Sequence, residues 1–258
     1  MTFLFDKAVF GPVFSRRLGI SLGMNLLPIS HKICTFDCLY CECGALLKDA
    51  KRSSSLPSRQ QVADELRSKL MEMKAENKLP NTITFAGNGE PTVHPDFKDI
   101  ISDTLALRNE FAPEAKVAVL SNATQLHNDA VVEALNAVDQ CILKIDSGND
   151  DLIQQLNQPN CTYSLEKTID NISKIGNNLI IQTMFVRWMK DNVEYNNADE
   201  ENVRQWLKVI ERIRPPKVMI YTIDRDTPLQ TMWKISKERL DEIAHLTEQI
   251  VPQVGISY

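Results

Sequence analysis

This sequence of 258 residues has no apolar run near the ~20 residues that a membrane-spanning helix needs, so we expect no membrane association. Its first residues lack a basic segment followed by a long apolar core, which predicts no signal peptide and a cytoplasmic location. No P-loop motif is present, and the four histidines have no spacing typical of a catalytic triad or a histidine-based metal site. Repeats and low-complexity tracts are also absent, which favours one domain over residues 1–258.

An excess of positive charge is lacking as well. The formal net charge is −5, which argues against general nucleic-acid binding but leaves room for a local basic face. Hydrophobic residues make up 43% and charged residues 24%, the balance of an ordinary globular protein. We expect a monomer.

Short apolar runs alternate with longer stretches of helical spacing, a pattern that predicts right-handed βαβ units and a parallel sheet. Ser58, Asn128 and Ser164 are expected to cap three of the helices. The fold class is therefore α/β, as an open (β/α)6 partial TIM-like barrel. Its core spans about residues 10–225, and residues 226–258 form a C-terminal helical tail. The expected strands are residues 18–27, 82–85, 116–120, 140–145, 179–186 and 217–223.

Four of the six cysteines lie within residues 34–43, too close together for a normal disulfide framework. Cys34, Cys38 and Cys41 have the spacing C-x3-C-x2-C, and three thiolates can hold three corners of an iron–sulfur cubane. A structural zinc site is the alternative, although a second cysteine pair downstream is missing. Cys43 is expected to be a bystander thiol, with a fourth cluster ligand as the other interpretation.

The cysteine segment, with Tyr40 before the third cysteine, resembles the loop that defines the radical S-adenosylmethionine (SAM) superfamily. The resemblance implies a [4Fe–4S] cluster on Cys34, Cys38 and Cys41, with SAM bound at the open iron. It also implies reductive cleavage of SAM to a 5′-deoxyadenosyl radical that abstracts hydrogen from a substrate, with Tyr40 near the adenine. A low-potential electron donor of the flavodoxin or ferredoxin type follows from the same chemistry.

A second motif, Gly87-Asn88-Gly89-Glu90, follows an expected strand after Ala86. Glycines at a strand end allow a tight turn and close backbone approach to a ligand. The segment is similar to the family's GGE motif, which receives the SAM amino group, and a plain βα turn is the alternative. At the end of the next strand, Ser121 and Asn122 either border the SAM pocket or cap the following helix.

Polar residues on two further strands complete the expected SAM contacts. Lys144 and Asp146 alternate within an apolar run, so they point to the same side of the strand. The resemblance assigns them to the SAM carboxylate or ribose, and a mutual ion pair is the alternative. Gln182 and Thr183 are expected near the adenine and ribose.

Three arginines are expected to hold substrate: Arg16 and Arg17 upstream of the cysteines, and Arg225 after the sixth strand. Solvated surface charge is the alternative for each. The upstream run and the Gly87–Glu90 motif resemble a stand-alone group related to wybutosine-type tRNA-modifying radical SAM proteins, which implies a tRNA base as substrate.

Other substrates and a different class of protein stay open. A peptide, as for glycyl-radical activating enzymes, and a small molecule are the alternative substrates, and a non-enzymatic zinc or iron–sulfur binding module is the alternative class. The polar segment 187–201 is expected to be a lid.

Overall fold

The computed structural model describes residues 3–15, 17–47, 55–225 and 227–258. These residues form an eight-stranded sheet with the order β1-β2-β3-β4-β5-β6-β9-β11, in which only β1 runs antiparallel to its neighbour. The strands are β1 (Val9–Ser15), β2 (Gly19–Met24), β3 (Thr82–Phe85), β4 (Lys116–Ser121), β5 (Gln140–Lys144), β6 (Leu179–Met184), β9 (Lys217–Tyr221) and β11 (Val254–Ser257).

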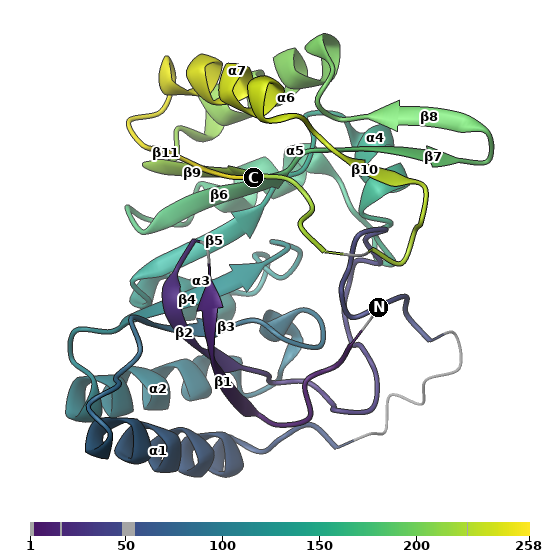
Figure 1. Ribbon diagram of the computed structural model, residues 1–258. Helices are drawn as coiled ribbons and strands as arrows, with labels where there is room; N and C mark the ends of the chain where they lie inside the picture. Colours follow the sequence, from purple (N-terminus) through teal and green to yellow (C-terminus); the bar gives the residue numbers. More distant parts are fainter. Residues whose placement is uncertain (1–2, 16, 48–54, 226) are drawn as a thin grey trace.

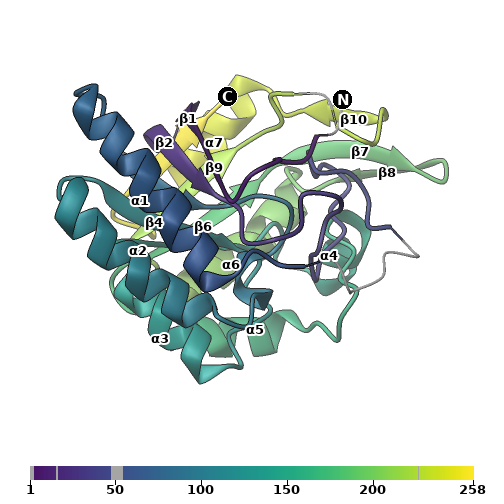
Figure 2. The same cartoon turned by 90° about the horizontal axis from the view of Figure 1, so that it is seen from below.

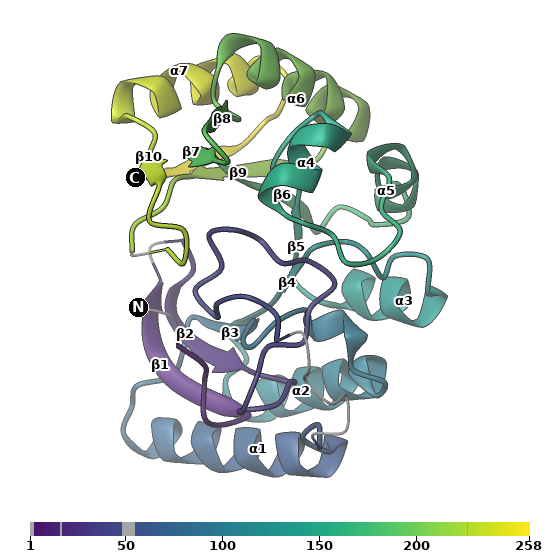
Figure 3. The same ribbon diagram turned by 90° about the vertical axis from the view of Figure 1, so that its right-hand side faces the viewer.

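The sheet curls into a half-barrel, with helices on its outer face (Figure 1, Figure 2). Figure 3 shows the strands following an arc from β1 to β9, while the segment between β2 and the first helix crosses in front of its middle. The expected six β/α units are therefore confirmed as a partial barrel. The helices are α1 (Arg59–Ala75), α2 (Phe97–Phe111), α3 (Asp129–Ala137), α4 (Asp150–Leu156), α5 (Leu165–Ile172), α6 (Glu200–Ile213) and α7 (Lys237–Glu248), with a 3-10 turn at Pro91–Val93.

The helix starts follow from local chemistry. The side chains of Ser58, Asn128 and Ser164 each accept a hydrogen bond from a backbone amide of the first turn, as expected from the sequence. In α1, Leu66 and Leu70 are fully buried against the sheet, because apolar residues four apart share one face of a helix.

Strand alternation separates an outer core from an inner face. In β5, Cys141 and Leu143 belong to the large apolar core between sheet and helices. Ile142 points the other way, into a small apolar cluster inside the half-barrel. Lys144 follows two residues later on the same inner face, so the strand delivers a charged group to the barrel mouth.

Two expectations need correction. Residues 226–258 are more than a helical tail, since they contain β10 (Met232–Lys234), α7 and β11, and β11 extends the parallel sheet by pairing with β9. The pairing of β11 stabilises the sheet, because it satisfies the backbone hydrogen-bonding groups along the edge of β9.

The segment 187–201, expected to be a long loop acting as a lid, is largely regular structure, and its role as a lid stays a prediction. It contains a hairpin of β7 (Val186–Lys190) and β8 (Val193–Asn196), which pairs with β10 in a second small sheet. Asp191 and Asn192 have φ of 53° and 62°, the backbone that a tight hairpin turn requires. Among the described residues, no helix has the length and apolar character needed to cross a membrane.

Candidate functional site

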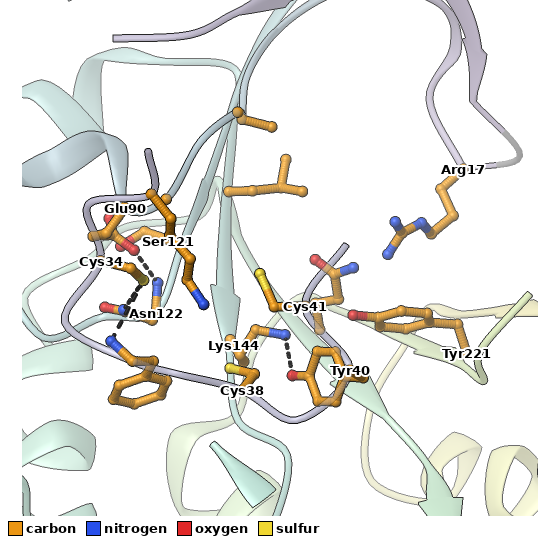
Figure 4. Close-up of a pocket in the computed structure, with 17 residues that line it drawn as sticks. Arg17, Cys34, Cys38, Tyr40, Cys41, Glu90, Ser121, Asn122, Lys144 and Tyr221 are labelled. Atoms are coloured by element: carbon orange, nitrogen blue, oxygen red, sulfur yellow. Dashed lines mark hydrogen bonds between the residues drawn. The ribbon is translucent and has the colours of Figure 1, made fainter. Parts of the chain in front are cut away.

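A cavity of about 220 Å³ opens at the carboxyl ends of the parallel strands (Figure 4). Ligand sites of α/β barrels lie at this edge of the sheet. Residues from the cysteine segment and from β3, β4, β5, β6 and β9 or the loops after them meet there. The lining residues are Arg17, Lys32, Cys34, Phe36, Cys38, Tyr40, Cys41, Ala86, Gly87, Gly89, Glu90, Leu120, Ser121, Asn122, Lys144, Gln182 and Tyr221.

Lys32, which the sequence analysis did not single out, holds the cysteine segment in shape. Its buried ammonium donates to the Asp37 carboxylate at 2.9 Å and to the Gly44 carbonyl at 3.0 Å. Burial opposes the charge, but the nearby Cys41 and Asp37 raise the pKa of Lys32 above its usual value. A lysine two residues before a cysteine motif was the only signal in the sequence.

The three thiols of Cys34, Cys38 and Cys41 line this single cavity. Side-chain amides lie near two of them: Asn122 Nδ2 is 3.6 Å from Cys34 Sγ, and Asn157 Nδ2 is 3.4 Å from Cys38 Sγ. Among the described residues, no three Cys, His, Asp or Glu side chains converge closely enough to hold one metal ion. Three thiols that line one cavity fit a cluster, whose cysteines bind separate irons.

The three thiols differ in pKa because their surroundings differ. Burial raises the pKa of Cys34 and of Cys38. A hydrogen bond from Cys43, supported by the Lys32 ammonium, lowers the pKa of Cys41 to about 6. The Cys43 thiol also lies 3.2 Å from the Gly87 carbonyl oxygen, and it is not among the described residues that line the cavity. Metal binding requires thiolates, so Cys41 is the thiol already closest to that form.

The glycine turn packs directly on the cysteine segment. A Cβ at Gly89, whose φ is +139°, would lie 1.7 Å from the Ile33 carbonyl oxygen. Glu90 is buried beside it and accepts hydrogen bonds from the Asn122 amide and from Thr92. Burial raises the pKa of Glu90, and these donors oppose that shift. Gly87, Gly89 and Glu90 all line the cavity.

Asn88, expected at the cofactor, lies elsewhere. Its fully buried side chain donates to the carbonyls of Phe5 and Pro28 and accepts from the Phe5 amide. It ties the N-terminal segment to the turn and does not appear among the described cavity residues. Its neighbours Gly87 and Gly89 do line the cavity, whereas these hydrogen bonds hold the Asn88 side chain at Phe5 and Pro28.

Tyr40 joins Lys144 and Asp146 into one network. Its hydroxyl donates to the Asp146 carboxylate and accepts from Lys144 Nζ at 2.7 Å (Figure 4). Lys144 Nζ is 3.6 Å from Asp146, so the ion pair weighed as the alternative is present, and the lysine also borders the cavity. Asn157, which no sequence pattern indicated, donates to Asp146 at 2.7 Å. Burial disfavours the ammonium, but Asp146 raises the pKa of Lys144 above its usual value.

Gln182 and Thr183 face opposite sides of β6. Gln182 lines the cavity. Ser121 at the end of β4 and Asn122 directly after it line the same cavity. Thr183 instead donates to the Ile145 carbonyl at 2.6 Å and accepts from Trp206 Nε1 at 3.0 Å in the outer core. Adjacent residues of a strand cannot both reach one face, so Thr183 is not a cavity residue.

The three expected substrate arginines have different positions. Arg16 lies outside the described residues. Arg17 stacks over the Tyr221 ring at 4.3 Å from its centroid and points toward the cavity (Figure 4). Arg225 is 64% exposed and forms an ion pair with Glu42 at 2.9 Å, so the surface salt bridge weighed for it is present.

Comparison with known proteins agrees with this geometry. A family model described as the radical SAM superfamily matches residues 29–187. A Brachyspira hyodysenteriae protein named GTPase Obg is 28% identical over 236 residues, which cover 92% of this chain and 33% of that protein. The UPF0026 protein slr1464 of Synechocystis is 30% identical over 230 residues, covering 86% of this chain and 78% of that protein. The chain thus spans a third of the first relative's length.

Solved structures share the fold at low sequence identity. A radical SAM methyltransferase from Sphaerobacter thermophilus has a TM-score of 0.67 and 14% identity, with 92% of this chain and 66% of that chain covered. Streptococcus suis SuiB bound to S-adenosylmethionine has a TM-score of 0.61 and 15% identity, with 88% and 49% covered. Archaeal TYW1 has a TM-score of 0.54 and 11% identity, with 90% and 72% covered.

Proposed function

This chain belongs to the radical SAM superfamily, and we propose that it is an enzyme that cleaves SAM reductively with a [4Fe–4S] cluster. The observation that carries the proposal is the single cavity in which the thiols of Cys34, Cys38 and Cys41 meet the Gly87–Glu90 turn and Lys144. When bound, the cluster supplies the electron that converts SAM to methionine and a 5′-deoxyadenosyl radical.

The chain's own residues would bind and orient these groups. Cys34, Cys38 and Cys41 would hold three irons and leave the fourth open. The buried Glu90 rigidifies the turn by accepting from the Asn122 amide, and the turn would receive the SAM amino group. Lys144, held by Tyr40 and Asp146, offers a fixed positive charge to the SAM carboxylate.

The remaining cavity residues would contact the adenosyl part of SAM. Tyr40 and Gln182 are proposed for the adenine and ribose, and Ser121 for the edge of the pocket. A low-potential donor of the flavodoxin or ferredoxin type is the proposed electron source, because reductive cleavage of SAM needs one electron from an external reductant.

The finer assignment to a wybutosine-related group stays a prediction, since the likeness to archaeal TYW1 at 11% identity concerns the fold alone. The sequence leaves a tRNA base, a peptide and a small molecule as substrates. We favour a small molecule, because a cavity of limited size adjoins the SAM site.

The test is an anaerobic reconstitution with iron and sulfide, followed by reduction with dithionite and an assay for 5′-deoxyadenosine from SAM. The SAM-induced change in the EPR spectrum of the reduced cluster is the second readout, because cleavage can require substrate. We expect about four iron and four sulfide per chain, as a cubane cluster requires.

The Cys38→Ala variant should lose most of the iron. Cys161→Ala is the matched control, because Cys161 is exposed and outside the cavity, and it should load like the parent protein. One zinc per chain without labile sulfide would refute the proposal. A fully loaded, reduced cluster whose EPR spectrum does not change when SAM is added would refute it as well.

A further inference from the structure

A second cavity of about 480 Å³ adjoins the SAM cavity on its outer side. Arg17, Tyr40 and Tyr221 line both cavities, so the two spaces meet at these side chains. Its walls combine apolar side chains with nearly as many polar or charged ones, which are Ser15, Arg17, Glu42, Thr222, Asp224, Arg225 and Thr227. The apolar lining residues are Phe3, Phe5, Val13, Phe14, Tyr40, Met184, Tyr221 and Ile223.

Arg17, at the border of the two cavities, has a guanidinium nitrogen without a hydrogen-bond partner in the described part of the chain. Its Nη1 atom is buried and has no hydrogen-bond partner among the described residues. The guanidinium lies over the Tyr221 ring, which accepts no hydrogen bond in the manner of an oxygen. A buried, charged donor without an acceptor is costly, and such groups are normally paired.

The other charged groups of the outer cavity are already partnered. Arg225 pairs with Glu42 at 2.9 Å, and Asp224 with Lys234 at 3.5 Å. Neither acid is paired with Arg17, so the cavity presents a positive charge that the described residues leave unneutralised. An anion with a fork of oxygens matches a guanidinium best, through two parallel hydrogen bonds.

We propose that the outer cavity binds the substrate as a small organic anion, whose carboxylate or phosphate is held by Arg17 and whose apolar body lies against the aromatic wall. The inference rests on the proposed function, because it places this anion beside the SAM cavity. A carboxylate in the SAM cavity already has Lys144, which leaves Arg17 at the shared border for a second anion.

Benzoate and phenyl phosphate are suitable probes, with benzamide as a neutral compound of nearly the same shape as benzoate. Each radiolabelled probe is dialysed to equilibrium against the reconstituted protein, with and without saturating SAM. We expect at least one anion to bind about tenfold tighter than benzamide, with the same affinity when SAM is present. The tighter of the two anions identifies the substrate group as carboxylate or phosphate.

The Arg17→Gln variant should bind both anions as weakly as benzamide, while Arg17→Lys should keep part of the preference. Arg67→Gln is the matched control, because Arg67 also stacks over an aromatic ring, that of Phe111 at 5.6 Å, but on the outer helices. It should bind the probes like the parent protein.

Equal binding of the anions and benzamide to the parent protein would overturn the proposal, as would an unchanged anion preference in Arg17→Gln. Displacement of the anions by SAM, together with weaker SAM binding by Arg17→Gln, would also overturn it and assign Arg17 to the SAM carboxylate. Probe binding needs no SAM cleavage, so failure of this inference is distinguishable from failure of the proposed function.

Discussion

Gly89 is the point at which the glycine turn touches the cysteine segment, and alanine does not fit there. The added Cβ would lie 1.7 Å from the Ile33 carbonyl oxygen and 2.5 Å from its carbonyl carbon. Both are backbone atoms, so no side chain can rotate to relieve the overlap. The Ile33 oxygen also accepts the Glu90 amide at 3.0 Å, and that hydrogen bond would break when the segments separate.

Three contributions set the size of the effect. Overpacking costs about 1–3 kcal/mol, a non-glycine residue at a φ of +139° adds about 1–3 kcal/mol, and the lost hydrogen bond adds about 1 kcal/mol. We expect Gly89→Ala to lower the free energy of unfolding by about 3–5 kcal/mol, since partial relaxation lowers the sum. The cysteine segment should shift as well and hold less iron.

The assay combines urea unfolding with iron content after reconstitution. Gly176→Ala serves as the control, because its Cβ would meet only Asn136 Oδ1, at 3.5 Å. That variant should stay within about 0.5 kcal/mol of the parent protein and load normally. If Gly89→Ala were as stable and as iron-rich as the control, the packing of the turn on the cysteine segment would be refuted.

Three further predictions concern other residues. Cys43→Ala should retain nearly all the iron, because Cys43 is not among the described cavity residues; iron loss would indicate a cluster closed by a fourth thiolate. Thr183→Val should lose about 1–2 kcal/mol of stability without weakening SAM binding, whereas Gln182→Leu should weaken SAM binding measured by EPR; the reverse pattern would contradict the placement of both residues. His94 is buried between the Pro57 carbonyl and the Asp96 amide, and burial lowers its pKa, so the unfolded chain takes up the proton first. The stability that neutral His94 contributes is complete above pH ~6.5 and is lost as the pH falls below that value. In urea unfolding, His94→Gln should therefore lose less stability on acidification than the parent protein. Equal slopes of the unfolding free energy against pH in the two proteins would refute this prediction.

Much of the fold follows from local patterns. Strand 82–85 has the same bounds in the structure as in the sequence analysis, because a run of apolar and β-branched residues ends at the glycine turn. The caps at Ser58, Asn128 and Ser164 depend only on the following turn of the same helix. The pairing of β11 with β9 was missed, since nothing within residues 254–257 says which distant strand edge is free.

Some features of the site also follow from local sequence patterns, whereas others depend on the tertiary structure. Spacing within one segment singled out Cys34, Cys38 and Cys41, which line one cavity, and strand alternation placed Lys144 and Asp146 on one side. Only the tertiary structure decided that Thr183 faces the outer core and that Asn88 binds the N-terminal segment. It alone brought Arg17 onto Tyr221, from the opposite end of the chain. The physical reason is that periodicity fixes which residues share a face, whereas the partner across a cavity depends on how the whole sheet curls.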